Sequence, residues 1–230
     1  MQIGSPLGAK PESDSMEDNP RFFDLVGNVR TMRRLRPDPV PEALLMKVLN
    51  AGVQAPSGMN SQPWSFLVLR KAEDKKWFAD RYKAAIESRF GNQPIPAEDD
   101  SPLARQFRAV RYQANHMHEF PVLVVVCGLR DWPFRVPKEE RVGLAPPNYG
   151  AIYPCVQNIL LACRAVGLGA ALTTMHQLFE EELMEHFQIP VEYGVVVTIP
   201  IGYPKGRFGR VRRRPAEELT HFDRWQTKVT

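Results

Sequence analysis

The stretch QAPSGMNSQPWSFLVL, residues 54–69, joins a helix-like run to a strand-like run through a loop dense in short polar residues. A plain turn needs only one or two such residues. This loop contains Pro56, Ser57, Gly58, Asn60, Ser61, Gln62 and Pro63. Short donors and acceptors beside packed apolar side chains suit a flat polar ligand. We therefore expect the loop to line a ligand site as well as to connect two buried elements.

Outward from this loop, the spacing of apolar residues predicts the neighbouring elements. Residues 41–55 form a helix that leads into the loop, and residues 64–70 form the strand that follows it. Further along, the pattern predicts helices at 73–90, 102–117, 148–166 and 179–187, strands at 121–128 and 195–201, and a short strand within LGAALTT at 168–174. Strands and helices alternate loosely, so the pattern alone allows an α/β or an α+β fold.

Length and composition indicate one globular domain, because the 230 residues are 43% apolar and 24% charged. The longest strongly apolar run, VLVVVC at 122–127, is far too short to span a bilayer. Residues 1–20 lack an apolar core, so they are interpreted as a flexible leader rather than a signal peptide. Residues 21–202 form the main domain, and residues 203–230 form a C-terminal arm of that domain.

The three cysteines, Cys127, Cys155 and Cys163, lie in apolar surroundings without the spacing of a metal site. Their odd number and the lack of a secretion signal indicate reduced thiols that pack in the core. We therefore expect a cytoplasmic protein with no membrane partner.

Positive charge is concentrated near the C-terminus. The net charge is +4, yet YPKGRFGRVRRR at 203–214 carries six cations and no acid, which leaves the rest of the chain at −2. Such a run can bind a nucleic acid, and that hypothesis predicts strongly salt-dependent binding to polyanions. The run lacks interleaved stacking aromatics beyond Phe208, and no DNA- or RNA-binding motif accompanies it, so we expect no nucleic-acid partner.

A second basic segment, NVRTMRRLRPDPVP at 28–41, combines arginines with one hydroxyl. Arg30, Thr31 and Arg33 have the chemistry of a phosphate monoester site, in which guanidinium groups bind the oxygens and a hydroxyl donates. The alternative from the residues alone is a solvated basic face.

Other chemical motifs do not occur in the sequence. There is no dinucleotide-binding glycine motif after a strand, no P-loop and no nucleophile elbow. His116 and His118 are two residues apart on an expected helix, where they point to different faces, so no metal site is predicted. No side-chain set suits nucleophilic catalysis, and the chemistry is therefore expected to reside in a cofactor.

Four segments in order resemble one family, the FMN-dependent nitroreductase-like oxidoreductases. RTMRRLRPDPVPEALL resembles its opening arginine segment, and APSGMNSQPWSF resembles its flavin loop. VQNILLACRAVGLGAALTT is similar to its central helix and turn, and IPIGYPKGRFGRVRRRPAEEL to its last strand and basic tail. The resemblance extends from residue 28 to residue 225.

The resemblance implies that Arg30, Thr31 and Arg33 bind the FMN phosphate and that Arg213 returns to it from the tail. Thr31 stands where the family usually has serine, which keeps the hydroxyl. Val29 stands where many relatives have another arginine, so one cation is missing from the pattern.

The same resemblance gives the loop and the later turn their roles. Pro56, Ser57 and Asn60 are expected to touch the ribityl chain and the isoalloxazine ring, usually from the neighbouring subunit. Thr173 and Thr174 are expected to face the ring near O4 and N5. From the residues alone these threonines read as a β-branched strand end. Gln113 and His116 are further candidates for ring contacts.

The implied fold is α+β, with three layers and a mostly antiparallel central sheet flanked by helices, in an intertwined homodimer with FMN at the interface. Tail aromatics are expected to lie on the second subunit, and loops 91–101 and 131–147 to shape the acceptor pocket. The implied reaction is ping-pong, with two-electron transfer from NAD(P)H, NADPH being favoured, to nitroaromatic or quinone acceptors. The chemistry takes place at flavin N5, and no side chain is assigned a catalytic role.

A reductive dehalogenase similar to halotyrosine deiodinases is the alternative within flavoproteins. Such enzymes use a Glu…Tyr…Lys set to hold an amino-acid zwitterion. The corresponding stretch, ADRYKAAIESRFGNQ at 79–93, offers Tyr82 and Lys83 but has no glutamate four residues before Tyr82. A zwitterion needs both of its charges paired, so this departure disfavours the alternative.

Overall fold

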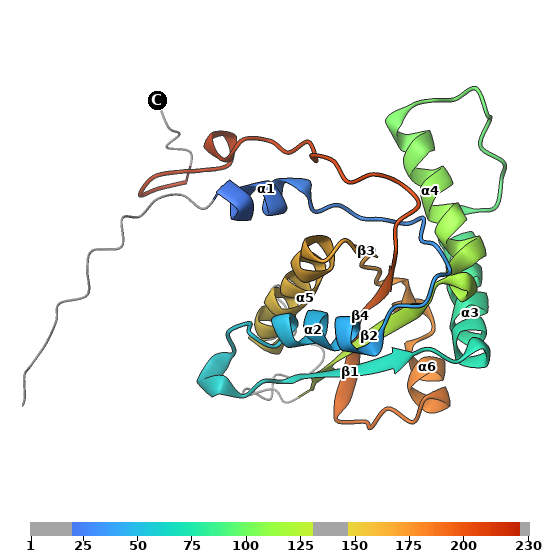
Figure 1. Cartoon of the computed structure of the whole chain (residues 1–230), viewed down its shortest axis with the longest axis horizontal. Coiled ribbons are helices and arrows are strands. Elements are labelled where there is room, and N and C mark those ends of the chain that lie inside the picture. The colour runs from blue at the N-terminus through green and yellow to red at the C-terminus, as the bar shows by residue number, and fades with distance from the viewer. Residues whose placement is uncertain (1–19, 131–146, 226–230) are drawn as a thin grey trace, which may run out of the picture.

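A computed structural model describes residues 20–130 and 147–225 of the chain (Figure 1). Its centre is a sheet of strands β1 (Trp64–Leu69), β2 (Val122–Leu129), β3 (Gly169–Ala170) and β4 (Tyr193–Gly202), in the order β1-β2-β4-β3. All three strand pairings are antiparallel. The α+β class is therefore confirmed, because an α/β fold would require parallel neighbours.

The two central strands, β2 and β4, are buried on both faces, which explains their continuous apolar sequences. Alternate residues of β2 enter two separate apolar clusters. Val122, Val124 and Val126 belong to one cluster, and Leu123 and Val125 belong to the other. The sheet is thus the middle layer of three.

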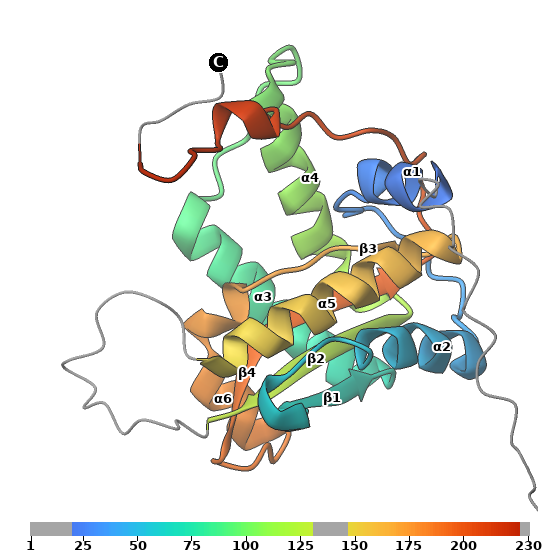
Figure 2. The ribbon, with the colours of Figure 1, turned by 90° about the vertical axis from the view of Figure 1, so that its left-hand side faces the viewer.

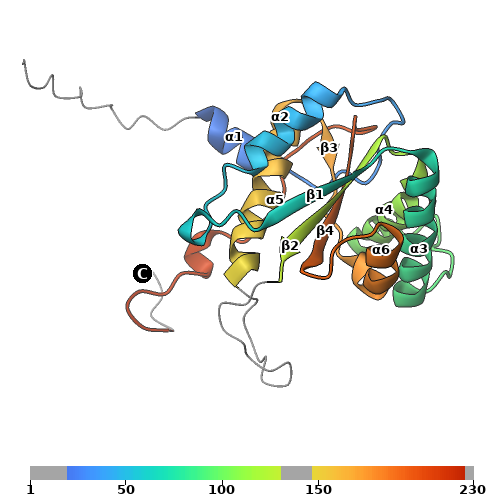
Figure 3. The same cartoon turned by 90° about the horizontal axis from the view of Figure 1, so that it is seen from below.

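Helices cover both faces of the sheet (Figure 3). On one face lie α2 (Glu42–Gly52) and α5 (Pro147–Ala165), which pack side by side (Figure 2). On the other face lie α3 (Ala72–Phe90), α4 (Pro102–His116) and α6 (Glu180–His186). Short 3-10 helices are η1 (Gly58–Asn60), η2 (Met117–Glu119), η4 (Met175–Leu178) and η5 (Ala216–Glu218).

Most elements begin and end within two residues of the bounds expected from the sequence. Two differences stand out. Helix α1 (Pro20–Asn28) was not predicted from the sequence; it packs beside α5. The strand expected within residues 168–174 comprises only Gly169–Ala170, with an isolated bridge between Thr173 and Thr198 further on.

Two segments far apart in sequence run side by side and position the site described below. The Arg36 N–H donates to the Tyr203 carbonyl at 2.7 Å, and the Lys205 N–H donates to the Arg34 carbonyl at 2.9 Å. The Met32 N–H donates to Ala170 at 2.8 Å, which fixes the first segment to the short strand β3. Residues 28–36 and 203–213 are called the arginine seam from here on.

Gly169 allows this close approach. A Cβ at this position would lie 2.9 Å from side-chain atoms of both Leu35 and Met32. The glycine is therefore needed for packing between β3 and the arginine seam.

Beyond the seam, the described tail exposes apolar side chains. Leu219 is 52% exposed, Phe222 is 53% exposed and Trp225 is 82% exposed. Their expected position on a second subunit stays a prediction. Phe208 differs from them, because it is half-buried within its own chain. No helix in residues 20–130 or 147–225 has the length and apolarity to cross a bilayer.

Candidate functional site

A cavity of about 450 Å³ lies between α1, α5 and the two segments of the arginine seam. Its wall is mostly apolar, with Leu160, Leu168, Leu172 and Phe208 among the lining side chains. The polar part of the lining consists of Arg30, Thr31, Gln157, Arg164 and Arg213. A cavity with large apolar walls and a cationic end suits a flat ring system that carries an anionic group.

A second cavity of about 670 Å³ adjoins the first and extends towards α4. The two share Arg30, Thr31, Val211 and Arg213, so they meet at the arginine seam. The second is lined in addition by Arg33 and Arg34, by Arg207 of the tail, and by the first turns of α4. It is the more strongly cationic of the two.

The structure brings together three of the residues expected at the phosphate. Arg30, Thr31 and Arg213 line both cavities, and all three are exposed to solvent. They come from opposite ends of the sequence and meet because the seam pairs residues 28–36 with the tail. Their role as phosphate ligands stays a prediction.

Arg33 lies deeper than the other three and lines only the second cavity. Burial lowers the pKa of its guanidinium, and the neighbouring Tyr82 hydroxyl opposes that effect. Tyr82 is a core residue, and burial raises its pKa, against a hydrogen bond with Thr173 and the charge of Arg33. Tyr82 thus interacts with the charge of Arg33 on one side and with the Thr173 side chain on the other.

Thr173 and Thr174 line neither cavity. The Thr173 backbone exchanges two hydrogen bonds of 2.9 Å with Thr198, and its hydroxyl accepts from the Met175 N–H at 3.3 Å. These contacts fit the strand-end interpretation of Thr173. Thr174 is half-buried at the start of η4, and its ring contact stays a prediction.

The polar loop lies apart from both cavities, because Pro56, Ser57 and Asn60 line neither. The Ser57 hydroxyl accepts from the Gln62 N–H at 3.0 Å. Met59, Asn60 and Gln62 have positive φ values of 52°, 55° and 49°. Such a concentration of left-handed residues is strained and is typical of functional loops. Its expected contact with a ligand of the neighbouring subunit stays a prediction.

Arg164 was missed by the sequence interpretation. Its guanidinium lies 4.2 Å from the centre of the Phe208 ring, as in a cation–π contact. Its Nε is buried and has no hydrogen-bond partner in the described residues. Because buried polar atoms are normally paired, the unpaired Nε is an exception among the described residues. Its position in the last turn of a strongly apolar helix was the available signal.

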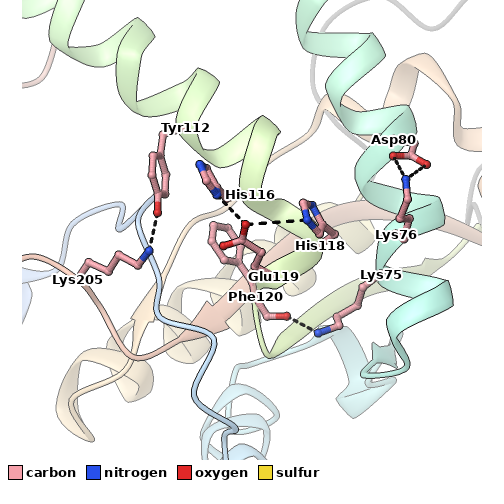
Figure 4. A network of polar contacts seen from close by, with 9 residues as sticks. All are labelled: Lys75, Lys76, Asp80, Tyr112, His116, His118, Glu119, Phe120 and Lys205. Atoms are coloured by element: carbon pink, nitrogen blue, oxygen red, sulfur yellow. Dashed lines mark hydrogen bonds and ion pairs between the residues drawn. The ribbon is translucent and has the colours of Figure 1, made fainter.

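The two further candidates, Gln113 and His116, line neither cavity. Gln113 is buried on α4, and its Nε2 has no hydrogen-bond partner in the described chain. His116 stacks on Tyr112 and contacts Glu119 through Nδ1 at 2.9 Å (Figure 4). This hydrogen bond lowers the pKa of Glu119. His116 therefore has a partner outside the site.

A polar network close to His116 holds the start of the tail against α4. Lys205 Nζ donates to the Tyr112 hydroxyl at 2.7 Å, and Lys75 Nζ donates to the Phe120 carbonyl at 2.7 Å (Figure 4). The network in Figure 4 contains two histidines and two carboxylates, His116, His118, Asp80 and Glu119, yet no group of described side chains is arranged to hold a metal ion. The hydrogen bond between Lys205 and Tyr112 is the contact in Figure 4 that joins the arginine seam to α4.

These features define an α+β protein with an apolar-walled cavity that is lined at one end by arginines. Comparison with known proteins gives the family: the chain belongs to the nitroreductase family, whose model matches residues 28–203. The predicted family and fold are thereby confirmed.

Individual relatives and solved structures are consistent with this family assignment. The chain is 49% identical to a protein named NADH dehydrogenase from Thermus thermophilus, over 83% of this chain and 90% of that one. It is 25% identical to a nitrobenzene nitroreductase from Ectopseudomonas oleovorans, over 90% and 99% of the two chains. Among solved structures, an iodotyrosine deiodinase bound to FMN and 3-iodo-L-tyrosine has a TM-score of 0.66 at 24% identity, over 84% of this chain and 95% of that chain.

Proposed function

We propose that the protein is an FMN-dependent NAD(P)H oxidoreductase that reduces nitroaromatic or quinone acceptors in two-electron steps. The observation that carries this proposal is the cavity in which Arg30, Thr31 and Arg213 meet beside an apolar wall. The names of the two relatives, an NADH dehydrogenase and a nitrobenzene nitroreductase, support the reaction class.

The residues present fit FMN on two grounds. Arg30 and Arg213 offer cations from separate segments, which suits a phosphate with close to two negative charges. Arg164 lines the same cavity, and its buried Nε has no hydrogen-bond partner in the described chain. When bound, FMN supplies the hydride and electron-pair chemistry that the side chains do not offer.

The residues of this chain would bind the FMN phosphate, orient the flavin ring and shield it from water. Arg30, Thr31 and Arg213 hold the phosphate, and Arg33 adds a half-buried positive charge next to the second cavity. The apolar wall of Leu160, Leu168 and Leu172 excludes water from the flat ring. Shielding of this kind strengthens the electrostatic contacts inside the site.

The second subunit completes the site in this proposal. The strained loop at Pro56, Ser57 and Asn60 lies outside the cavities of its own chain, as expected if it serves the other subunit. The exposed Phe222 and Trp225 offer apolar area for the same interface. We propose a homodimer in the cytoplasm.

The dehalogenase alternative is weakened by the position of Tyr82. Tyr82 is only 2% exposed and stacks with the fully buried Phe78, which stands where a zwitterion-binding enzyme would have its glutamate. A core tyrosine is not placed to grip an amino-acid substrate.

Steady-state kinetics test the proposal. With NADPH or NADH varied against nitrobenzene or a benzoquinone, we expect parallel double-reciprocal lines, since donor and acceptor use the site in turn. Turnover of 3-iodotyrosine at a rate exceeding that of both acceptors would instead support the dehalogenase. No turnover with any of these acceptors would contradict the oxidoreductase assignment.

A further inference from the structure

The second cavity contains more positive charge than a flavin phosphate can use. Six arginines line it, from three separate parts of the chain: Arg30, Arg33, Arg34, Arg105, Arg207 and Arg213. No carboxylate is among its lining residues in the described chain. A phosphate monoester carries about two negative charges at neutral pH. Several cations are therefore left over after FMN is bound.

Few of these arginines have acidic partners in residues 20–130 and 147–225. Arg105 Nη1 lies 3.1 Å from the Asp100 carboxylate, which also lies 3.6 Å from Arg108. Arg34 lies over the Tyr112 ring at 5.2 Å from its centre, which leaves its charge unneutralised. Like charges crowded without counterions repel one another, and an anionic ligand relieves that cost.

The α4 helix adds to this field. Its first turns line the cavity through Pro102, Arg105 and Gln106, and no acid occupies the first turn. The positive end of the dipole of this 15-residue helix therefore faces the cavity region, and the two carboxylates nearest to it, Asp99 and Asp100, precede the helix and do not line the cavity. Arginines and helix terminus together favour a ligand with more than one phosphate.

We propose that this second cavity binds the phosphates of the nicotinamide dinucleotide donor, with Arg105 and Arg207 as ligands that the flavin does not use. Both line the second cavity and not the first. Nitroaromatic and quinone acceptors need carry no charge, whereas the donor always carries a pyrophosphate. The inference rests on the proposed function, because it concerns the electron donor of that reaction.

The test is isothermal titration calorimetry of the FMN-loaded protein with ADP and with adenosine 2′,5′-bisphosphate. Both arginines are exposed, so their substitution by glutamine is not expected to disturb the fold. For the double variant Arg105→Gln/Arg207→Gln we expect affinity to fall roughly tenfold or more, as for the loss of charge-assisted contacts. Arg212→Gln is the matched control, since it removes one tail charge outside both linings.

The two ligands distinguish the source of the phosphate. Weaker binding of both ligands assigns the cavity to the 5′-phosphate that they share, which is one half of the donor's pyrophosphate. Weaker binding of ADP alone assigns it to the other half of the pyrophosphate, and weaker binding of the bisphosphate alone assigns it to the 2′-phosphate of NADPH. Unchanged affinity for both ligands in the double variant would overturn the proposal, as would loss of FMN from it. Failure of the proposed function has a different signature, because a wild-type chain that retains no flavin would reveal it before any nucleotide is added.

Kinetics provide a second readout. We expect the double variant to raise KM for the donor roughly tenfold with little change in kcat, because phosphate contacts remote from the reacting atoms contribute uniform binding. A fall in kcat at unchanged KM would contradict this assignment.

Discussion

The two central strands and the arginine seam are built by different means. In β2 and β4 nearly every side chain is buried, and the local apolar pattern alone specifies the strand. In the seam, Arg30, Thr31 and Arg213 are exposed, and they meet only through backbone pairing between residues distant in sequence. The comparison shows that the core provides stability, whereas the seam provides charge at a place that the core determines.

The largest effect on the free energy of unfolding is expected when a buried side chain of the core is shortened. Ile199→Ala removes a side chain with no exposed surface and should lower the free energy of unfolding by about 2–5 kcal/mol. Urea denaturation followed by circular dichroism measures it. Val191→Ala, at an 80% exposed side chain, is the control and should change little. Equal effects of the two substitutions would refute the packing assignment.

Neutralising arginines of the seam should weaken FMN binding and leave the stability of the core unchanged. Arg30→Gln/Arg213→Gln should weaken FMN binding roughly a hundredfold, since two charge-assisted contacts are lost. The urea midpoint should stay near that of the wild type because both side chains are exposed. Flavin fluorescence titration measures the affinity, with Arg212→Gln as the matched control. An unchanged affinity in the double variant would remove both arginines from the phosphate site.

Gly169 joins the two regions, so its substitution tests their connection. In Gly169→Val the added side chain meets Leu35 and Met32, and we expect a loss of about 1–3 kcal/mol of stability. FMN affinity should fall as well, because the seam must shift. Gly150→Val, where an added Cβ has no neighbour within 4 Å, is the control for the loss of a glycine. Loss of stability with full FMN affinity would show that the seam does not depend on β3.

The smallest expected effect is the dependence of folding stability on pH. Burial lowers the pKa of His176, whose Nε2 lies 3.0 Å from the Val195 carbonyl; the nearby Glu180 carboxylate opposes that shift. The folded state therefore binds this proton less readily than the unfolded state. Stability should fall as pH drops below the ordinary histidine value of about 6.5, with a slope approaching one proton until the folded pKa is reached.

Urea titrations between pH 7 and pH 5 measure that slope. Glu180 faces His176, so its own titration must be separated from that of the histidine. His176→Gln should reduce the slope even if the variant is less stable overall. A slope that is the same in both proteins would assign the acid sensitivity to other groups.

The sequence contained enough information for the fold and for part of the site. Continuous apolar runs identified β2 and β4, and helical spacing identified α2 and α5. The basic segments containing Arg30 and Arg213 were recognisable as anion-binding chemistry. That these two segments lie side by side could not be predicted, because it depends on long-range hydrogen bonds such as that between Arg36 and Tyr203.

Other features could not be read from residue types. Arg164 was not singled out from the sequence, and only the structure shows that its Nε is buried and that the residue lines a cavity. Tyr82 looked like a candidate substrate ligand, but packing against Phe78 places it in the core. The predicted acceptor loop at 131–147 lies almost entirely outside the described residues. Burial and cavity shape depend on tertiary packing, which no local pattern encodes.

The most direct test of the central claim is a titration of FMN fluorescence with the purified wild-type chain. The account predicts quenching that saturates at one flavin per chain with a dissociation constant of about 1 μM or below, as several phosphate contacts and a buried ring require. It also predicts that the absorption bands of the flavin stay with the protein through desalting. Free flavin fluorescence at every protein concentration would contradict the claim that the arginine seam is a flavin phosphate site.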